Sequence, residues 1–134
     1  MVIGSGGRRP PQGRDRLQPA GAIYFMMDEK DVQGAMSHSG AMIGSDGIPF
    51  DTHPHPRLWG AFPRVLGHFS RDVGLFPLHT AVHKMTGLSA ARFGLKGRGE
   101  IREGYWADLV LFDPATVRDV ADFHDPQRAA QGID

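Results

Sequence analysis

The sequence predicts an α/β fold, and three observations in the first ordered part of the chain carry that prediction. Residues 22–27 form an uninterrupted apolar run of strand length, as in a strand that is buried on both faces. A helical pattern follows, and residues 41–43 form a second short apolar run. A strand–helix–strand order favours a parallel sheet.

The helix between these two runs is predicted to begin after Asp28, a residue type that caps helix N-termini well. Two acidic residues fall in its first turn, where the helix dipole favours negative charge. Val32, Ala35 and Met36 stand at i, i+3 and i+4 and give the helix one apolar stripe. Ser39 and Gly40 then end it.

Three further helical segments are predicted after the proline-rich loop at 48–56. Residues 58–69 keep helical spacing, which Pro63 interrupts. Pro77 is a good first-turn residue for the next helix. Ser89 is predicted to cap a short last helix that Gly94 closes.

Glycine and proline divide the chain into three predicted parts. The first 21 residues hold five Gly, three Pro and four Arg and few apolar residues, so we expect a disordered lead-in. Residues 22–95 carry the α/β pattern. In residues 96–134, turn signals surround short β elements, of which 109–112 is a clear strand run and 117–123 a weaker one.

Charge and composition exclude several classes of protein. Lys plus Arg and Asp plus Glu both number 15, so no excess charge indicates a nucleic-acid or membrane partner. The absence of Cys excludes a disulfide scaffold, thiolate metal ligands and a cysteine nucleophile. The longest apolar run, 22–27, is far shorter than the ~18 residues of a membrane span. We expect a cytoplasmic location.

Asp46 is the sharpest candidate for chemistry. It follows the apolar run 41–43 and lies between Gly44 and Gly47, which allow a tight turn. Catalytic residues gather at this end of strands in α/β folds, where a carboxylate can bind a metal or accept a proton from water. The alternative is an Asx-turn or a helix cap without a catalytic role.

Other polar residues give weaker signals. Arg57 could hold a carboxylate with two hydrogen bonds, or form an ordinary surface salt bridge. Asp51, His53 and His55 alternate along an extended segment and could bind zinc, although solvated histidines are more common in such loops. Ser45 lacks the surroundings of a nucleophile elbow.

His79 and His83 have the i, i+4 spacing of a zinc-binding pair, but Thr80 stands where a metalloprotease has Glu. They also lie opposite the apolar side of their predicted helix. A solvated polar face is therefore the preferred interpretation.

Six motifs in order resemble the D-aminoacylase (N-acyl-D-amino-acid deacylase) family of the amidohydrolase superfamily, over about residues 21–134. They are MIGSDG at 42–47, PHPRLWG at 54–60, FPRVLG at 62–67, KMTG at 84–87, AARFGL at 90–95 and ADLVLFDPAT at 107–116. The last motif alone would indicate only the superfamily. Residues 1–20 do not share the resemblance.

The resemblance implies a metal-dependent hydrolase with a (β/α)8 barrel and a small β-sandwich. It assigns 22–27 to the seventh barrel strand, 41–43 to the eighth, and the segment after residue 95 to the sandwich. Asp46 matches the acid that is both a zinc ligand and the general base. Arg57 matches the arginine that binds the α-carboxylate of an N-acyl-D-amino acid. Neither His53 nor the pair at 79 and 83 matches a family ligand.

The family's remaining zinc ligands, a His-x-His pair, a bridging Cys and two further His, lie upstream of the resembling region. The resemblance therefore implies an incomplete fold: the last two βα units of the barrel and part of the sandwich, with an incomplete zinc site. We expect this C-terminal fragment to be inactive in isolation. Its open strand edges favour self-association or pairing with a missing N-terminal piece.

Two alternatives remain open. One is a non-enzymatic remnant or a complementing partner of a separate N-terminal piece. The other is a sister amidohydrolase, such as an N-acyl-D-glutamate or N-acyl-D-aspartate deacylase or a hydantoinase-like enzyme.

Overall fold

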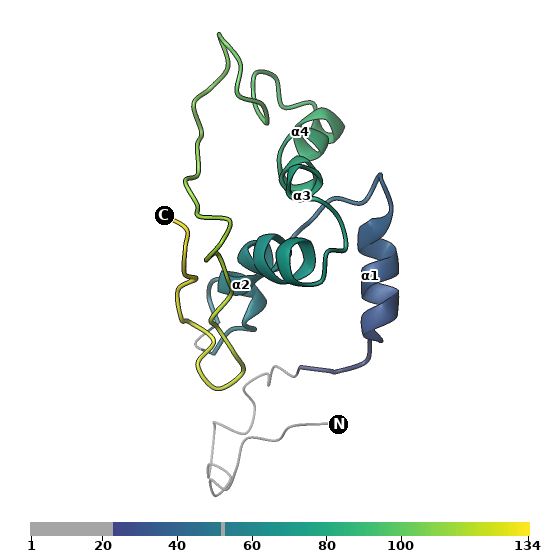
Figure 1. Cartoon of the computed structure of the whole chain (residues 1–134). Coiled ribbons are helices and arrows are strands. Elements are labelled where there is room, and N and C mark those ends of the chain that lie inside the picture. Colours follow the sequence, from purple (N-terminus) through teal and green to yellow (C-terminus); the bar gives the residue numbers. More distant parts are fainter. Residues whose placement is uncertain (1–22, 52) are drawn as a thin grey trace, which may run out of the picture.

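The computed structural model describes residues 23–51 and 53–134, so the predicted lead-in at 1–21 and the first residue of the run 22–27 lie outside it. The described chain holds helices and isolated bridges (Figure 1). The helical segments are α1 (Glu29–Ser37), α2 (Arg57–Arg64), the π-helix η2 (Val65–Asp72), α3 (Leu78–Met85) and α4 (Gly87–Phe93). In this part of the chain, none of the helices has the length and apolar character needed to cross a bilayer.

Helix α1 forms as its sequence predicts. The Asp28 carboxylate accepts a hydrogen bond of 2.8 Å from the backbone N–H of Lys30, and Asp28 itself is the N-cap. Val32 and Met36 from the predicted stripe are partly buried against the core, whereas Ala35 is exposed. The cap and the stripe together explain why this segment is helical.

Helix α2 continues without a gap into η2, although Pro63 was expected to interrupt the pattern. Pro63 has no N–H to donate to the preceding turn, and the chain changes from α to π hydrogen bonding two residues later. In η2, Val65, Leu66, Gly67, Phe69 and Ser70 are buried. Buried residues therefore lie on more than one side of η2, unlike in a helix with a single apolar stripe.

Helices α3 and α4 follow the predicted signals with one correction. Pro77 is the N-cap of α3, and Gly94 ends α4 in the left-handed conformation with φ 66°. Ser89 was predicted as the cap of the last helix, but α4 begins at Gly87 and contains it. The Ser89 hydroxyl instead donates to the carbonyl of Lys84 at 3.2 Å.

The predicted strands are not formed in the described part of the chain. The described residues of the run at 22–27, and those at 41–43, have no regular secondary structure and pair with no other strand. Met26 is 82% exposed, so the run is not buried on either face. A strand forms only where a neighbouring strand pairs with its backbone, and the described part of the chain offers neither run such a neighbour.

The segment after residue 95 contains bridges in place of the predicted strands at 109–112 and 117–123. Phe112 pairs with Ile133, and Arg118 pairs with Gln131, both antiparallel. In Figure 1 this segment runs as an irregular trace along one side of the helices, opposite α1.

The core joins this last segment to the helices. Val117 is fully buried in one cluster with residues of η2, α3 and the turn between them: Val65, Leu66, Phe69, Phe76 and Ala81. The Arg71 guanidinium of η2 donates to the carbonyl oxygens of Pro114 at 3.2 Å and Val117 at 2.8 Å. Described residues of both predicted parts, 22–95 and 96–134, thus contribute to one core, while the division between the two parts stays a prediction.

Candidate functional site

Asp46 lies in the turn that leads from 41–43 toward α2. Its φ is 48°, and it is the single non-glycine residue with positive φ among the described residues. Asp tolerates the left-handed region better than most residues. Its side chain is 86% exposed. The Ser45 hydroxyl accepts the turn hydrogen bond from Gly47 N–H at 3.3 Å, which leaves the Asp46 carboxylate available for Arg57.

Arg57 begins α2 and binds Asp46 twice. Its Nη2 lies 2.7 Å from Asp46 Oδ2, and its Nε donates to the Asp46 carbonyl oxygen at 2.9 Å. The two residues that the sequence proposed as base and carboxylate anchor are therefore neighbours across ten intervening residues. A guanidinium with a bound carboxylate is the arrangement expected of a carboxylate-binding site, here formed with a side chain of the same chain.

Close backbone packing holds this arrangement together. A Cβ on Gly47 would lie 2.6 Å from Leu58 Cδ1 and 3.2 Å from Leu58 Cα. Only glycine allows the turn to approach the start of α2 so closely. Gly47 thus contributes to the short distance between Asp46 and Arg57.

His55 borders the ion pair. Its Nδ1 accepts a hydrogen bond of 3.0 Å from the backbone N–H of Arg57. Burial and the positive charge of Arg57 lower the pKa of His55 below its ordinary value, and the opposing effect of Asp46 is smaller. The neutral imidazole is therefore favoured.

The aromatic ring of Phe123 closes the same region from the C-terminal segment. It packs edge-on against His55 with ring centroids 5.2 Å apart and against Phe25 at 4.9 Å. Its carbonyl oxygen lies 3.2 Å from His53 Nε2. No local pattern could indicate the role of Phe123, because its contact with His53 joins residues 70 positions apart.

The metal-site hypotheses from histidine spacing find no support in the described residues, which contain no group of three potential His or carboxylate ligands. The Asp51 carboxylate accepts from the backbone N–H of His53 at 3.2 Å, a local turn contact. His79 and His83 are both exposed on α3, as predicted for a solvated face.

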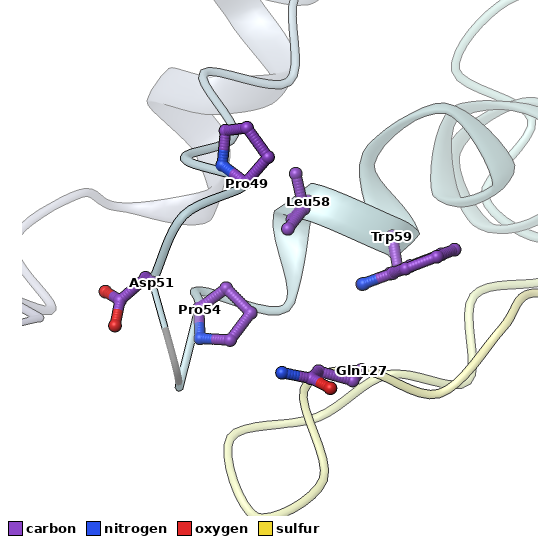
Figure 2. A pocket seen from close by; sticks show the side chains of 6 residues that line it. All are labelled: Pro49, Asp51, Pro54, Leu58, Trp59 and Gln127. Carbon is purple, nitrogen blue, oxygen red and sulfur yellow. The ribbon is translucent and has the colours of Figure 1, made fainter.

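An open hollow of about 330 Å³ lies beside α2 (Figure 2). Pro49, Asp51 and Pro54 come from the loop before α2, Leu58 and Trp59 from its first turn, and Gln127 from the C-terminal segment. Figure 2 shows these side chains around the space between the loop and the helix. Four of these six lining residues are apolar, and Leu58 directly follows Arg57 in the chain, so the hollow suits the apolar part of a ligand.

Sequence comparisons give one consistent result. A model described as the amidohydrolase family matches residues 14–134. We expected the resemblance to begin at about Gly21, so the match begins seven residues earlier than expected. A D-aminoacylase of Alcaligenes xylosoxydans xylosoxydans is 69% identical over 117 residues, which are 87% of this chain and 24% of that protein. An N-acyl-D-aspartate deacylase of the same organism is 58% identical over 88% of this chain and 24% of its own length.

Solved structures agree with the sequence matches. A D-aminoacylase crystal structure superposes with a TM-score of 0.85 at 67% identity, over 89% of this chain and 25% of that one. An N-acyl-D-glutamate deacylase from Bordetella bronchiseptica, solved with zinc and a phosphonate inhibitor that mimics the tetrahedral intermediate, superposes with a TM-score of 0.86 at 52% identity. The chain spans about a quarter of the length of these relatives.

Proposed function

Because the chain belongs to the amidohydrolase family, we propose that it supplies the carboxylate-binding side of the active site of a D-aminoacylase. The reaction is hydrolysis of the amide bond of an N-acyl-D-amino acid to a carboxylate and a free D-amino acid. The observation that carries the proposal is the contact of 2.7 Å between Arg57 and Asp46. That contact lies in a segment matched at 69% identity by a D-aminoacylase.

Arg57 is the proposed anchor for the α-carboxylate of the substrate. Its guanidinium binds the carboxylate of Asp46 in this structure, and the same N–H donors could bind the carboxylate of a substrate in its place. A substrate carboxylate would replace Asp46 on Arg57. The hollow that begins at Leu58 would then receive the amino-acid side chain.

Asp46 is the proposed proton carrier. Once released from Arg57, its carboxylate accepts a proton from the water that attacks the acyl carbon. The C–N bond breaks as the same proton passes to the leaving nitrogen, so the carboxylate is regenerated. Its high exposure leaves room for the substrate beside it.

Zinc was present in the B. bronchiseptica relative, and we propose a zinc-dependent enzyme here. The described residues by themselves do not fit a zinc ion, because Asp46 is not joined by two further ligands. Protein zinc sites need at least three protein ligands. Additional ligands must come from outside the described residues, and the proton transfer above depends only on Asp46.

The chain is proposed to act with the rest of a barrel, as its last two βα units and part of a β-sandwich. Tyr24, Phe25, Met26 and Met27 are 50–82% exposed, although the chain superposes well on a quarter of a complete enzyme. Exposed apolar runs of this kind tend to associate with other apolar surfaces, either in another protein or in a second copy of the chain. The isolated chain is then inactive and prone to self-association, and its cytoplasmic location stays a prediction.

The test is complementation. The purified chain is mixed with the complementary three quarters of the A. xylosoxydans D-aminoacylase and zinc, and release of free D-amino acid from N-acetyl-D-methionine is measured. Arg57→Gln should weaken binding and Asp46→Asn should abolish turnover. Arg64→Gln is the matched control, because Arg64 is an α2 arginine that pairs with Asp119 away from the turn.

A chimera, in which residues 23–134 replace the matched part of the relative, keeps the test decisive if the two pieces fail to associate. Turnover that survives both Asp46→Asn and Arg57→Gln would overturn the proposal. Faster release from N-acetyl-D-aspartate or N-acetyl-D-glutamate than from N-acetyl-D-methionine would instead favour a sister deacylase, which the 58% and 54% identities to such enzymes make the second candidate.

A further inference from the structure

Lys84 of α3 is a buried lysine that the proposed chemistry does not use. Its side chain is 2% exposed, and within residues 23–51 and 53–134 no carboxylate pairs with it. Lysine is almost never fully buried without partners, because its ammonium group loses its hydration. Its ammonium group donates to two backbone carbonyl oxygens, those of His38 at 2.6 Å and Ala41 at 3.2 Å, and lies 5.8 Å from the ring centroid of Phe76.

The first of these carbonyls belongs to the C-cap of α1, whereas Ala41 lies beyond the end of that helix. His38 is the C-cap of that helix, and α1 has no basic residue in its last turn. The last carbonyls of a helix lack partners within it and form the negative end of its dipole. Lys84 of α3 therefore places a cation and hydrogen-bond donors just beyond the C-terminal end of α1, where the His38 carbonyl also accepts from the N–H of Ala41 at 3.0 Å.

The backbone of Lys84 holds the same segment at a third point. Its carbonyl oxygen accepts from the N–H of Ile43 at 3.4 Å, and also from the Ser89 hydroxyl at 3.2 Å. Residues 38–43 are thus fixed to α3 at three points along their length. Asp46 follows only three residues after the last of them.

We infer that Lys84 is a positioning residue, which fixes residues 38–43 on α3 and so sets the place of Asp46 beside Arg57. The inference rests on the proposed function only for the role of Asp46. The contacts themselves are independent of that role. Since the segment at 41–43 has no strand neighbour in the described chain, these hydrogen bonds attach its backbone to α3, while the side chain of Ile43 packs against the core.

The test compares Lys84→Met, which keeps an unbranched apolar stem but removes the donors, with Val117→Ala, a core truncation that removes none of the hydrogen bonds of Lys84. Both are measured in the full chain by amide hydrogen exchange and by the NMR signal of the Arg57 Nε–H that donates to Asp46. Lys84→Met should speed exchange in residues 39–47 at least about tenfold more than in η2, and should shift or broaden the Arg57 signal. Val117→Ala should speed exchange without this preference.

Uniform acceleration in Lys84→Met, or an unchanged Arg57 signal, would overturn the inference. If Lys84→Met does not fold, Lys84→Gln retains donors on a shorter stem and should show the same local pattern at smaller size. In the complemented enzyme, Lys84→Met should lower kcat about ten- to hundredfold with little change in KM. The exchange result holds even if the chain has no deacylase role, so the two proposals fail separately.

Discussion

The ion pair between Asp46 and Arg57 allows a quantitative test of how the candidate site is held together. We consider Arg57→Met, which keeps most of the apolar stem of the side chain and removes the guanidinium. Asp46→Asn removes the charge but keeps a residue type that tolerates the positive φ at this position. The double variant completes a cycle that isolates the interaction between the two side chains.

The structure sets the expected size of each effect. The two side chains are 38% and 86% exposed, so solvent screens the ion pair, and its coupling free energy should be about 0.2–1 kcal/mol. The Arg57 Nε–H donated to the Asp46 carbonyl should contribute a further ~0.5–1.5 kcal/mol, and this contact survives in Asp46→Asn. Arg57→Met should therefore lower the free energy of unfolding by about 1–2 kcal/mol, and Asp46→Asn by less than 1 kcal/mol.

Urea denaturation followed by circular dichroism measures these free energies. Salt separates the two contacts, because the Debye length falls from about 8 Å at 0.15 M to about 3 Å at 1 M salt. The coupling free energy should decrease in 1 M NaCl, while the loss from removing the Nε donor should remain. The Arg64–Asp119 pair, with atoms 3.2 Å apart, is the matched control cycle.

Equal losses from Arg57→Met and Asp46→Asn would refute this reasoning, because they would mean that the backbone carbonyl contact contributes nothing. A coupling free energy above about 2 kcal/mol would refute it in the other direction, since an exposed pair does not reach that value.

Three further predictions concern the same structure. Gly67→Ala should lower the free energy of unfolding in urea by about 1–3 kcal/mol or more, because a Cβ there would lie 2.3 Å from the backbone oxygen of Val117; no loss would contradict this packing. Asp28→Ala should cost about 1 kcal/mol by the same measurement and reduce helical circular dichroism, because α1 loses its cap; Asp28→Asn, which retains a capping oxygen, should lose less. The lowered pKa of His55 in the folded state means that its contribution to stability is present above about pH 6.5 and is lost as the pH falls below that value. Stability of His55→Gln should therefore fall less between pH 7 and pH 5 than that of the parent chain, and identical pH profiles would contradict the assignment.

Local chemistry made the helices predictable. Asp28, Pro77 and Gly94 act within one turn of themselves, so the helix ends they mark are found in the structure. The place of Ser89 inside α4 was not predicted, because its hydroxyl donates to the carbonyl of a residue five positions earlier, and capping rules do not consider such a contact.

The strands could not be predicted in the same way, because a strand depends on a partner that may lie anywhere in a fold. The apolar runs have strand composition, yet composition alone does not supply a neighbouring backbone. Phe112 and Arg118 pair only through residues 131–133 at the other end of the segment. Non-local pairing is invisible to patterns read along the chain.

The residues of the candidate site also fall into two groups, those that the sequence could indicate and those that only the folded structure reveals. Asp46 and Arg57 could be named from local signals and from the family resemblance, and the structure brings them together. Lys84 stands in the sequence only as part of the KMTG motif, and its burial could not be predicted there, because lysine is almost never fully buried without partners. Phe123 had no such signal, because only the folded chain brings it to His55.

The continuous helical segment formed by α2 and η2 limits where the length of this chain can vary. Arg57 stands at one end of that segment and Arg71 at the other, and each holds a different part of the protein. One residue inserted or deleted between them would turn everything beyond it by about 100°. Because five of the eight residues of η2 are buried, such a rotation would move buried side chains to the surface and exposed ones into the core. We therefore expect insertions and deletions to be tolerated only outside this segment, in the loop before Pro56 or in the turn around Gly74, where they leave the spacing between Arg57 and Arg71 unchanged.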